Sequence, residues 1–141
     1  KITFSDMEAM KEKYEDKLIA NASLIFDIKE KYNNLESSET AMNSYIYDED
    51  STYKKLNSYM ESLIGLQLQT NEGYIDEDKN EMVFNITPYY QSLLNGKVTN
   101  NTIYLHTSSR GTSLNQIVIP GKTASTPGRL EIEYYKTDKQ N

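Results

Sequence analysis

The chain has 141 residues, which is enough for one domain with a buried core and short for two. Hydrophobic residues make up 37% of it and charged residues 26%, and no apolar run is long enough to predict a membrane span. The formal net charge is −6, with the acidic excess confined to residues 1–80, and this distribution argues against a basic surface for nucleic acid.

Cysteine is absent, which excludes disulfide bonds, thiolate metal sites and cysteine nucleophiles together. This absence is ordinary in bacterial surface proteins and unusual in a secreted eukaryotic domain. The sequence opens at Lys1 without a start methionine or a targeting segment, so we expect it to be a piece of a longer protein.

The first third of the chain predicts one helix and two strands. Ser5-Asp6-Met7-Glu8 matches a capping box, which predicts a short helix over residues 6–16. Alternating apolar residues over 18–28 predict the first core strand. The polar stretch 29–43 is expected to be a long exposed connection, and Tyr45-Ile46-Tyr47 a second short strand.

Residues 51–74 carry two competing patterns. The apolar positions of 53–64 have helical spacing, and Gly65 is suited to end a helix, whereas a β-sandwich would favour strands and loops here. Leu66 and Leu68 begin an alternating segment, and Gly73 is expected to mark a turn. The structure of this stretch is left open.

The second half of the chain has clearer signals. Residues 81–86 alternate as a strand, after which Thr87 can cap a helix, Pro88 suits its first turn and Gly96 can end it. Three more strands are expected, separated by turn residues, at about 102–107, 114–119 and 129–135. The whole pattern predicts a mainly β fold: a jelly-roll-like antiparallel β-sandwich with a short N-terminal helix and one helix inserted near residues 87–95.

Four runs in this half resemble a known family: FNITPYYQSLLNGK at 84–97, IYL at 103–105, SLNQIVI at 113–119 and RLEIEYY at 129–135. The order is similar to the C-terminal end of a family of Bacteroidota outer-membrane lipoproteins of unknown function, and more distantly to jelly-roll modules of bacterial surface enzymes and adhesins. The resemblance covers about residues 82–135 well. One departure is Asn101-Thr102-Ile103, where an aromatic residue and a glycine would be expected.

The resemblance implies that residues 1–141 are a single sandwich domain, the C-terminal part of a longer lipoprotein of a diderm bacterium. It implies a signal peptide and a lipid-bearing cysteine upstream, so that the membrane is contacted only through an anchor outside this piece. The implied location is extracytoplasmic, at the outer membrane or cell surface. The tripeptide Asp50-Ser51-Thr52 also resembles a short O-glycosylation acceptor of Bacteroidota, which makes Ser51 a possible modification site.

Catalytic chemistry has little support in the sequence. His106 is the one histidine, and no Gly-x-Ser-x-Gly motif is present, so we expect no enzyme and keep a small hydrolase only as a distant alternative. Acidic clusters occur at 48–50 and 76–78, neither with EF-hand spacing. Asp76 and Asp78 are the candidates for a structural calcium ion, and no other cofactor is expected.

Tyrosine is abundant, with 12 residues, and tryptophan is absent. The tyrosines that alternate within expected strands are read as sheet residues: Tyr45, Tyr47, Tyr104, Tyr134 and Tyr135. Tyr53, Tyr59 and Tyr74 are expected to be more exposed and are the candidate ligand-binding residues.

The leading hypothesis is a non-enzymatic, surface-exposed lipoprotein domain that acts as an interaction or structural module with a protein or glycan partner. The alternative is a carbohydrate-binding module of a cell-surface glycan system. A row of exposed tyrosines on one concave face would favour this alternative.

Overall fold

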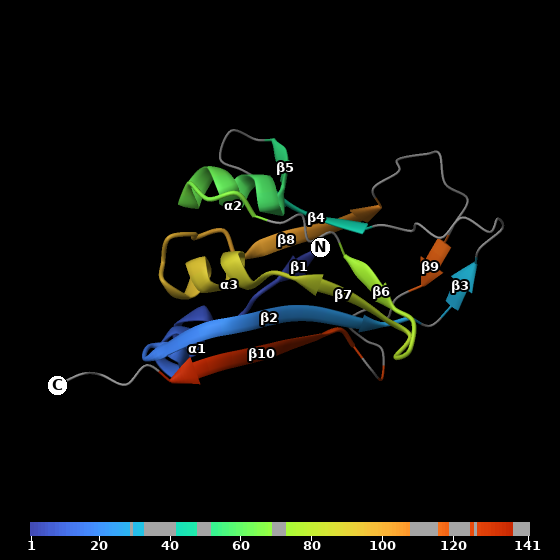
Figure 1. Ribbon diagram of the computed structural model, residues 1–141, viewed down its shortest axis with the longest axis horizontal. Coiled ribbons are helices and arrows are strands. Elements are labelled where there is room, and N and C mark those ends of the chain that lie inside the picture. Colours follow the sequence, from blue (N-terminus) through green and yellow to red (C-terminus); the bar gives the residue numbers. More distant parts are fainter. Residues whose placement is uncertain are drawn as a thin grey trace.

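The computed structural model describes residues 1–28, 30–32, 42–47, 52–68, 73–107, 116–118, 125 and 127–136. In these residues the chain is mainly β, with two antiparallel four-stranded sheets that lie one above the other in Figure 1. Sheet I has the order β1 (Ile2–Thr3), β8 (Thr102–Thr107), β4 (Met42–Tyr47) and β5 (Tyr53–Lys55). Sheet II has the order β10 (Arg129–Lys136), β2 (Lys17–Asp27), β7 (Glu81–Asn85) and β6 (Tyr74–Asp76).

The expected mainly β sandwich is confirmed by these two sheets. A further strand pair, β3 (Glu30–Tyr32) with β9 (Gln116–Val118), stands apart from them. The helices of the described chain are α1 (Met7–Tyr14), α2 (Leu56–Ile64) and α3 (Thr87–Leu94). None of these helices has the length and apolar character needed to cross a membrane.

The core is built from the inward face of each sheet and from the helices. Strand alternation turns Leu24 and Phe26 of β2 inward beside Phe84 of β7, while Ile46 and Ile103 come from sheet I. The helices add a further set of buried side chains: Tyr14, Leu56, Met60, Tyr89, Tyr90 and Leu93. Helices α2 and α3 therefore close one end of the sandwich (Figure 1).

Helix α3 also takes the place of a strand beside β2. Pairing of β2 with β7 ends at Ser23, where the chain of β7 turns into α3. From there the hydroxyl of Thr87 accepts the backbone N–H of Ala22 at 2.8 Å, and Gln91 Oε1 accepts that of Ile19 at 3.0 Å. The helix thus satisfies backbone donors that the sheet would otherwise leave unpaired.

Several local expectations are wrong. Thr87 was expected to cap α3, but it is the first helical residue and Ile86 stands at the N-cap. At α1 the N-cap is Asp6, in a left-handed conformation with no side-chain capping bond, so the capping box does not form. Tyr134 lies opposite the buried Ile19 and packs edge to face on Tyr14, but it stays 42% exposed on the outer strand β10.

One stretch that the sequence left open and one that was expected to be a connection are now defined. Within 51–74 the helical spacing proves to be the correct signal: α2 ends at Gly65, whose φ of 70° and N–H bond to Glu61 O form its C-cap. Within 29–43, expected to be a connection, the chain forms β3 and the first residues of β4.

Candidate functional site

The outward side of sheet I carries a group of aromatic side chains, which we call the tyrosine face. Ile46 and Ile103 point into the core, so their strand neighbours point outward. Cross-strand register then places Tyr45 opposite Tyr104 and Tyr47 opposite Tyr53. The tyrosine face consists of Tyr45, Tyr47, Tyr53, Tyr104 and His106.

The rings of this face contact one another edge to face. The centroids of Tyr47 and Tyr53 lie 4.9 Å apart, and those of Tyr53 and Tyr104 lie 5.2 Å apart with planes at 89°. Tyr45 and His106 form a third, looser pair at 6.4 Å and 83°. Such pairs contribute ~0.5–1.5 kcal/mol beyond their buried area, so the rings hold one another in place while Tyr53 stays 55% exposed.

A pocket of about 270 Å³ opens on this face. The described residues that line it are Tyr45, Tyr53, Tyr104, Leu105 and His106. Pockets for drug-sized ligands span roughly 300–1,000 Å³. This pocket is therefore of a size to hold a single ring or a comparably small group.

One buried polar side chain lies beside His106 on the same side of sheet I. Asn43 is opposite His106 in the β4–β8 register and is 4% exposed. Its Nδ2 is buried and has no hydrogen-bond partner. Among the described residues, no other buried side-chain nitrogen or oxygen is left unpaired in this way. Leaving such a donor unpaired costs ~1–3 kcal/mol, which marks Asn43 as an unusual residue.

The two sheets differ in charge. No strand of sheet I contains Asp or Glu, and β5 contributes Lys54 and Lys55. The outward side of sheet II instead carries carboxylates on all four of its strands, at Asp27, Asp76, Glu81, Glu131 and Glu133. The tyrosine face is therefore built on strands without carboxylates in an otherwise acidic chain.

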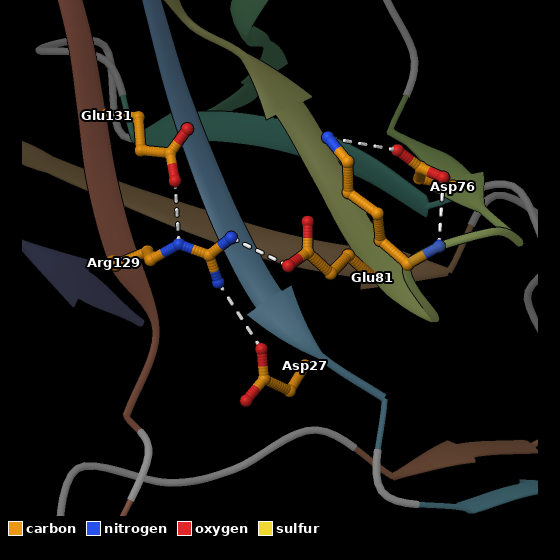
Figure 2. Close-up of polar contacts among 6 residues, drawn as sticks. Asp27, Asp76, Glu81, Arg129 and Glu131 are labelled. Atoms are coloured by element: carbon orange, nitrogen blue, oxygen red, sulfur yellow. Dashed lines mark hydrogen bonds and ion pairs between the residues drawn. The ribbon is translucent and has the colours of Figure 1, made fainter.

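Most of these carboxylates are engaged by one arginine, as Figure 2 shows. Arg129 of β10 contacts Glu81 at 2.7 Å, Glu131 at 2.8 Å and Asp27 at 3.3 Å. Hydrogen bonds to Glu131 and Glu81 raise the pKa of Arg129. The cluster joins β10, β2 and β7, and its groups pair with one another, so we assign it a structural role.

The three tyrosines expected to bind ligand lie in three different places. Tyr53 belongs to the tyrosine face. Tyr59 is half-buried on α2 and packs against the core, and Tyr74 is 57% exposed on β6 of sheet II. Sequence reasoning assigned the remaining tyrosines of the face to sheets, which is correct, but missed that they share one exposed side.

The signal that could have found them is the alternation itself. In Tyr45-Ile46-Tyr47 and in Tyr104-Leu105-His106 an aliphatic residue lies between two aromatic ones. Burial of the aliphatic residue turns both aromatic neighbours to the other side of the sheet. Two such strands side by side make an aromatic surface.

The candidate calcium ligands lie in the turn between β6 and β7. Asp76 Oδ1 accepts the backbone N–H of Lys79 at 3.2 Å, and its Oδ2 is 3.6 Å from Lys79 Nζ, an ion pair drawn in Figure 2. Asp78 is exposed in the same turn. Among the described residues no group of three or more acidic or histidine side chains is arranged to hold a metal ion. Ser51 and the acidic run 48–50 lie outside the described residues.

His106 lies on the tyrosine face and is exposed. The surroundings of His106 on this sheet are aromatic and suit contact with a ligand.

Comparison of the chain with protein-family models, with curated proteins and with solved structures found no match, so its resemblance to the lipoprotein family stays an expectation.

Proposed function

We propose that this chain is a non-catalytic binding module whose ligand is a carbohydrate and whose binding surface is the tyrosine face. The observation that carries the proposal is the group of partly exposed rings, packed edge to face on one another, around a 270 Å³ pocket on sheet I. This is the feature that distinguishes a glycan module from a purely structural sandwich.

The chemistry of a sugar suits this surface. A pyranose ring has an apolar C–H side, which packs on an aromatic ring, and a rim of hydroxyls that need hydrogen-bond partners. Tyrosine offers both a flat apolar body and a hydroxyl. Because its side chain has only two torsions, fixing it in a complex costs little conformational entropy. The edge-to-face packing of Tyr53 against Tyr47 and Tyr104 preorganises the rings before a ligand arrives.

The proposal includes a location outside the cytoplasm, on a cell surface, with a lipid anchor outside this piece. Support for it comes from the absence of cysteine and from the resemblance of residues 82–135 to surface lipoproteins. A protein ligand is the competing occupant of the face, because tyrosines are also enriched at protein interfaces.

The test compares two tyrosines of equal exposure on opposite sheets. Tyr53 is 55% exposed on the tyrosine face and Tyr74 is 57% exposed on β6, so Tyr74→Ala is a matched control for Tyr53→Ala. The chain has no tryptophan, so tyrosine fluorescence reports binding directly. The titrants are a panel of soluble neutral and acidic polysaccharides.

We expect at least one polysaccharide to bind, with an affinity that falls at least ~10-fold in Tyr53→Ala, as for an aromatic hot spot, and is unchanged in Tyr74→Ala. The proposal would be contradicted if both variants lost affinity equally. It would also be contradicted if no polysaccharide of the panel bound the parent chain or its variants.

A further inference from the structure

The tyrosines of the tyrosine face divide between the inside and the outside of its pocket. Tyr45, Tyr53 and Tyr104 are among the described residues that line the pocket, and Tyr47 is not among them. Tyr47 still touches the lining, because its ring centroid lies 4.9 Å from that of Tyr53. It is 40% exposed, so part of its side chain faces solvent beside the pocket.

The ring of Tyr53 connects these two parts of the face. Tyr53 belongs to β5 and Tyr104 to β8, which flank β4, so their backbones are two strand spacings apart, or ~9.6 Å. Their ring centroids are 5.2 Å apart, so the two side chains lean toward each other over β4. Tyr53 therefore forms a wall of the pocket and is at the same time the neighbour of Tyr47 outside it.

The fold fixes the position of Tyr47 relative to the pocket. Its backbone carbonyl accepts a hydrogen bond from Asn100 Nδ2 at 2.8 Å, and its strand pairs with β5 at Tyr53. Tyr45 and Tyr47 are two residues apart on β4, which places them ~6.8 Å apart along the strand and on the same side of the sheet. This offset is similar to the length of one unit in a sugar chain, so neighbouring units of one ligand can reach both positions.

We propose that the tyrosine face binds two consecutive units of a sugar chain, one in the pocket and the next on the exposed side chain of Tyr47. The pocket of about 270 Å³ is of a size for a single ring, and Tyr47 offers an apolar surface to the unit beside it. The ligand class is then an oligosaccharide or polysaccharide, and Tyr47 selects it over a free monosaccharide. This inference rests on the proposed carbohydrate function and deepens it.

The experiment compares sugars that differ only in length. Each monosaccharide is paired with its 1,4-linked disaccharide: glucose with cellobiose, mannose with mannobiose, xylose with xylobiose, and galacturonic acid with digalacturonic acid. Affinity is measured by calorimetry for the parent chain, Tyr47→Ala, Tyr47→Phe and Tyr104→Ala. For at least one pair we expect the parent chain to bind the disaccharide at least ~10-fold more tightly, about 1.4 kcal/mol.

Tyr47→Ala is expected to bind the disaccharide no more tightly than the monosaccharide, while its affinity for the monosaccharide stays at the parent value. This split distinguishes a direct contact from a supporting role, because a Tyr47 that only held Tyr53 in place would affect both sugars alike. Tyr47→Phe keeps the ring and should keep the preference. Tyr47→Thr, which suits a strand and lacks the ring, replaces Tyr47→Ala if that variant does not fold.

Tyr104→Ala is the control inside the pocket. It removes a lining ring, so it should weaken both members of a pair by the same factor and leave their ratio unchanged.

Three results with a sugar that binds would overturn the inference: equal affinity of the parent chain for both members of the pair, a preference that survives in Tyr47→Ala, or an equal loss of both sugars in that variant. The carbohydrate function stands in these cases, because the parent chain binds sugar. Binding of no pair would also overturn the inference, and the carbohydrate function then stands if a polysaccharide binds through Tyr53. Loss of all Tyr53-dependent glycan binding would overturn both.

Discussion

Gly73 lies at the start of β6 against the ring of Phe84. A Cβ at position 73 would come within 2.3 Å of Phe84 Cε1, and Phe84 is a core residue with 1% exposure. Phe84 in turn packs edge to face on Phe26 at 6.3 Å. The sequence marked Gly73 as a turn residue, but what requires glycine here is the close approach of a buried ring.

We predict that Gly73→Ala destabilises the fold by ~1–3 kcal/mol, since the added methyl overpacks a ring that has no room to move. Urea unfolding measures the change. In the double variant Gly73→Ala with Phe84→Leu the clash is relieved. The double variant should therefore lose less free energy of unfolding than the two single variants lose in sum. Additive losses would show that the ring is not the cause.

At the scale of elements, α3 connects the strands of sheet II to the core. It replaces a neighbouring strand along β2, and it buries Tyr89 and Tyr90 almost completely. The hydroxyl of Tyr89 donates to the backbone oxygen of Asn100 at 2.7 Å. Burial raises the pKa of Tyr89, and electrostatic repulsion from nearby Tyr59 adds a smaller increase. The pKa of Tyr90 is raised in the same way, first by burial and then by Tyr14.

These raised pKa values predict loss of stability in alkali. A tyrosine of the unfolded chain ionises near pH ~10, whereas Tyr89 and Tyr90 stay protonated to higher pH in the folded chain. Their contribution is therefore complete below pH ~10 and declines as the pH rises above it, because the unfolded chain then binds fewer protons.

The measurement is the urea midpoint as a function of pH. We expect a fall that begins near pH ~10 and is less steep in Tyr89→Phe, which has no ionisable group at this position. A midpoint that stays constant well above that pH, or one whose fall is unaffected by Tyr89→Phe, would contradict the role of the buried hydroxyl.

At the scale of the whole molecule, strands with one buried face were predictable from sequence. Alternation over 18–28, 81–86 and 129–135 located β2, β7 and β10, because alternate apolar residues of each strand pack into the core cluster. Helix α2 was visible as helical spacing, but the preference of a sandwich for strands competed with that local signal. The O-glycosylation and calcium predictions at Ser51, Asp76 and Asp78 stay predictions.

The tyrosine face could not be predicted as a unit. Its tyrosines come from three strands, and the pairing of Tyr45 with Tyr104 joins residues far apart in the chain. Register of this kind depends on long-range packing rather than on local pattern. The sequence showed the alternation of each strand, and the fold decided which strands became neighbours and which side stayed exposed.

The two outer sides of the sandwich are therefore unlike: sheet I presents tyrosines packed edge to face, and sheet II presents carboxylates gathered around Arg129 (Figure 2). The most direct measurement of the central claim is a map of backbone amide chemical shifts during titration with a polysaccharide that binds. We predict that the largest changes fall on β4, β5 and β8. Changes centred on β10, β2 and β7 instead would contradict the assignment of the tyrosine face as the binding surface.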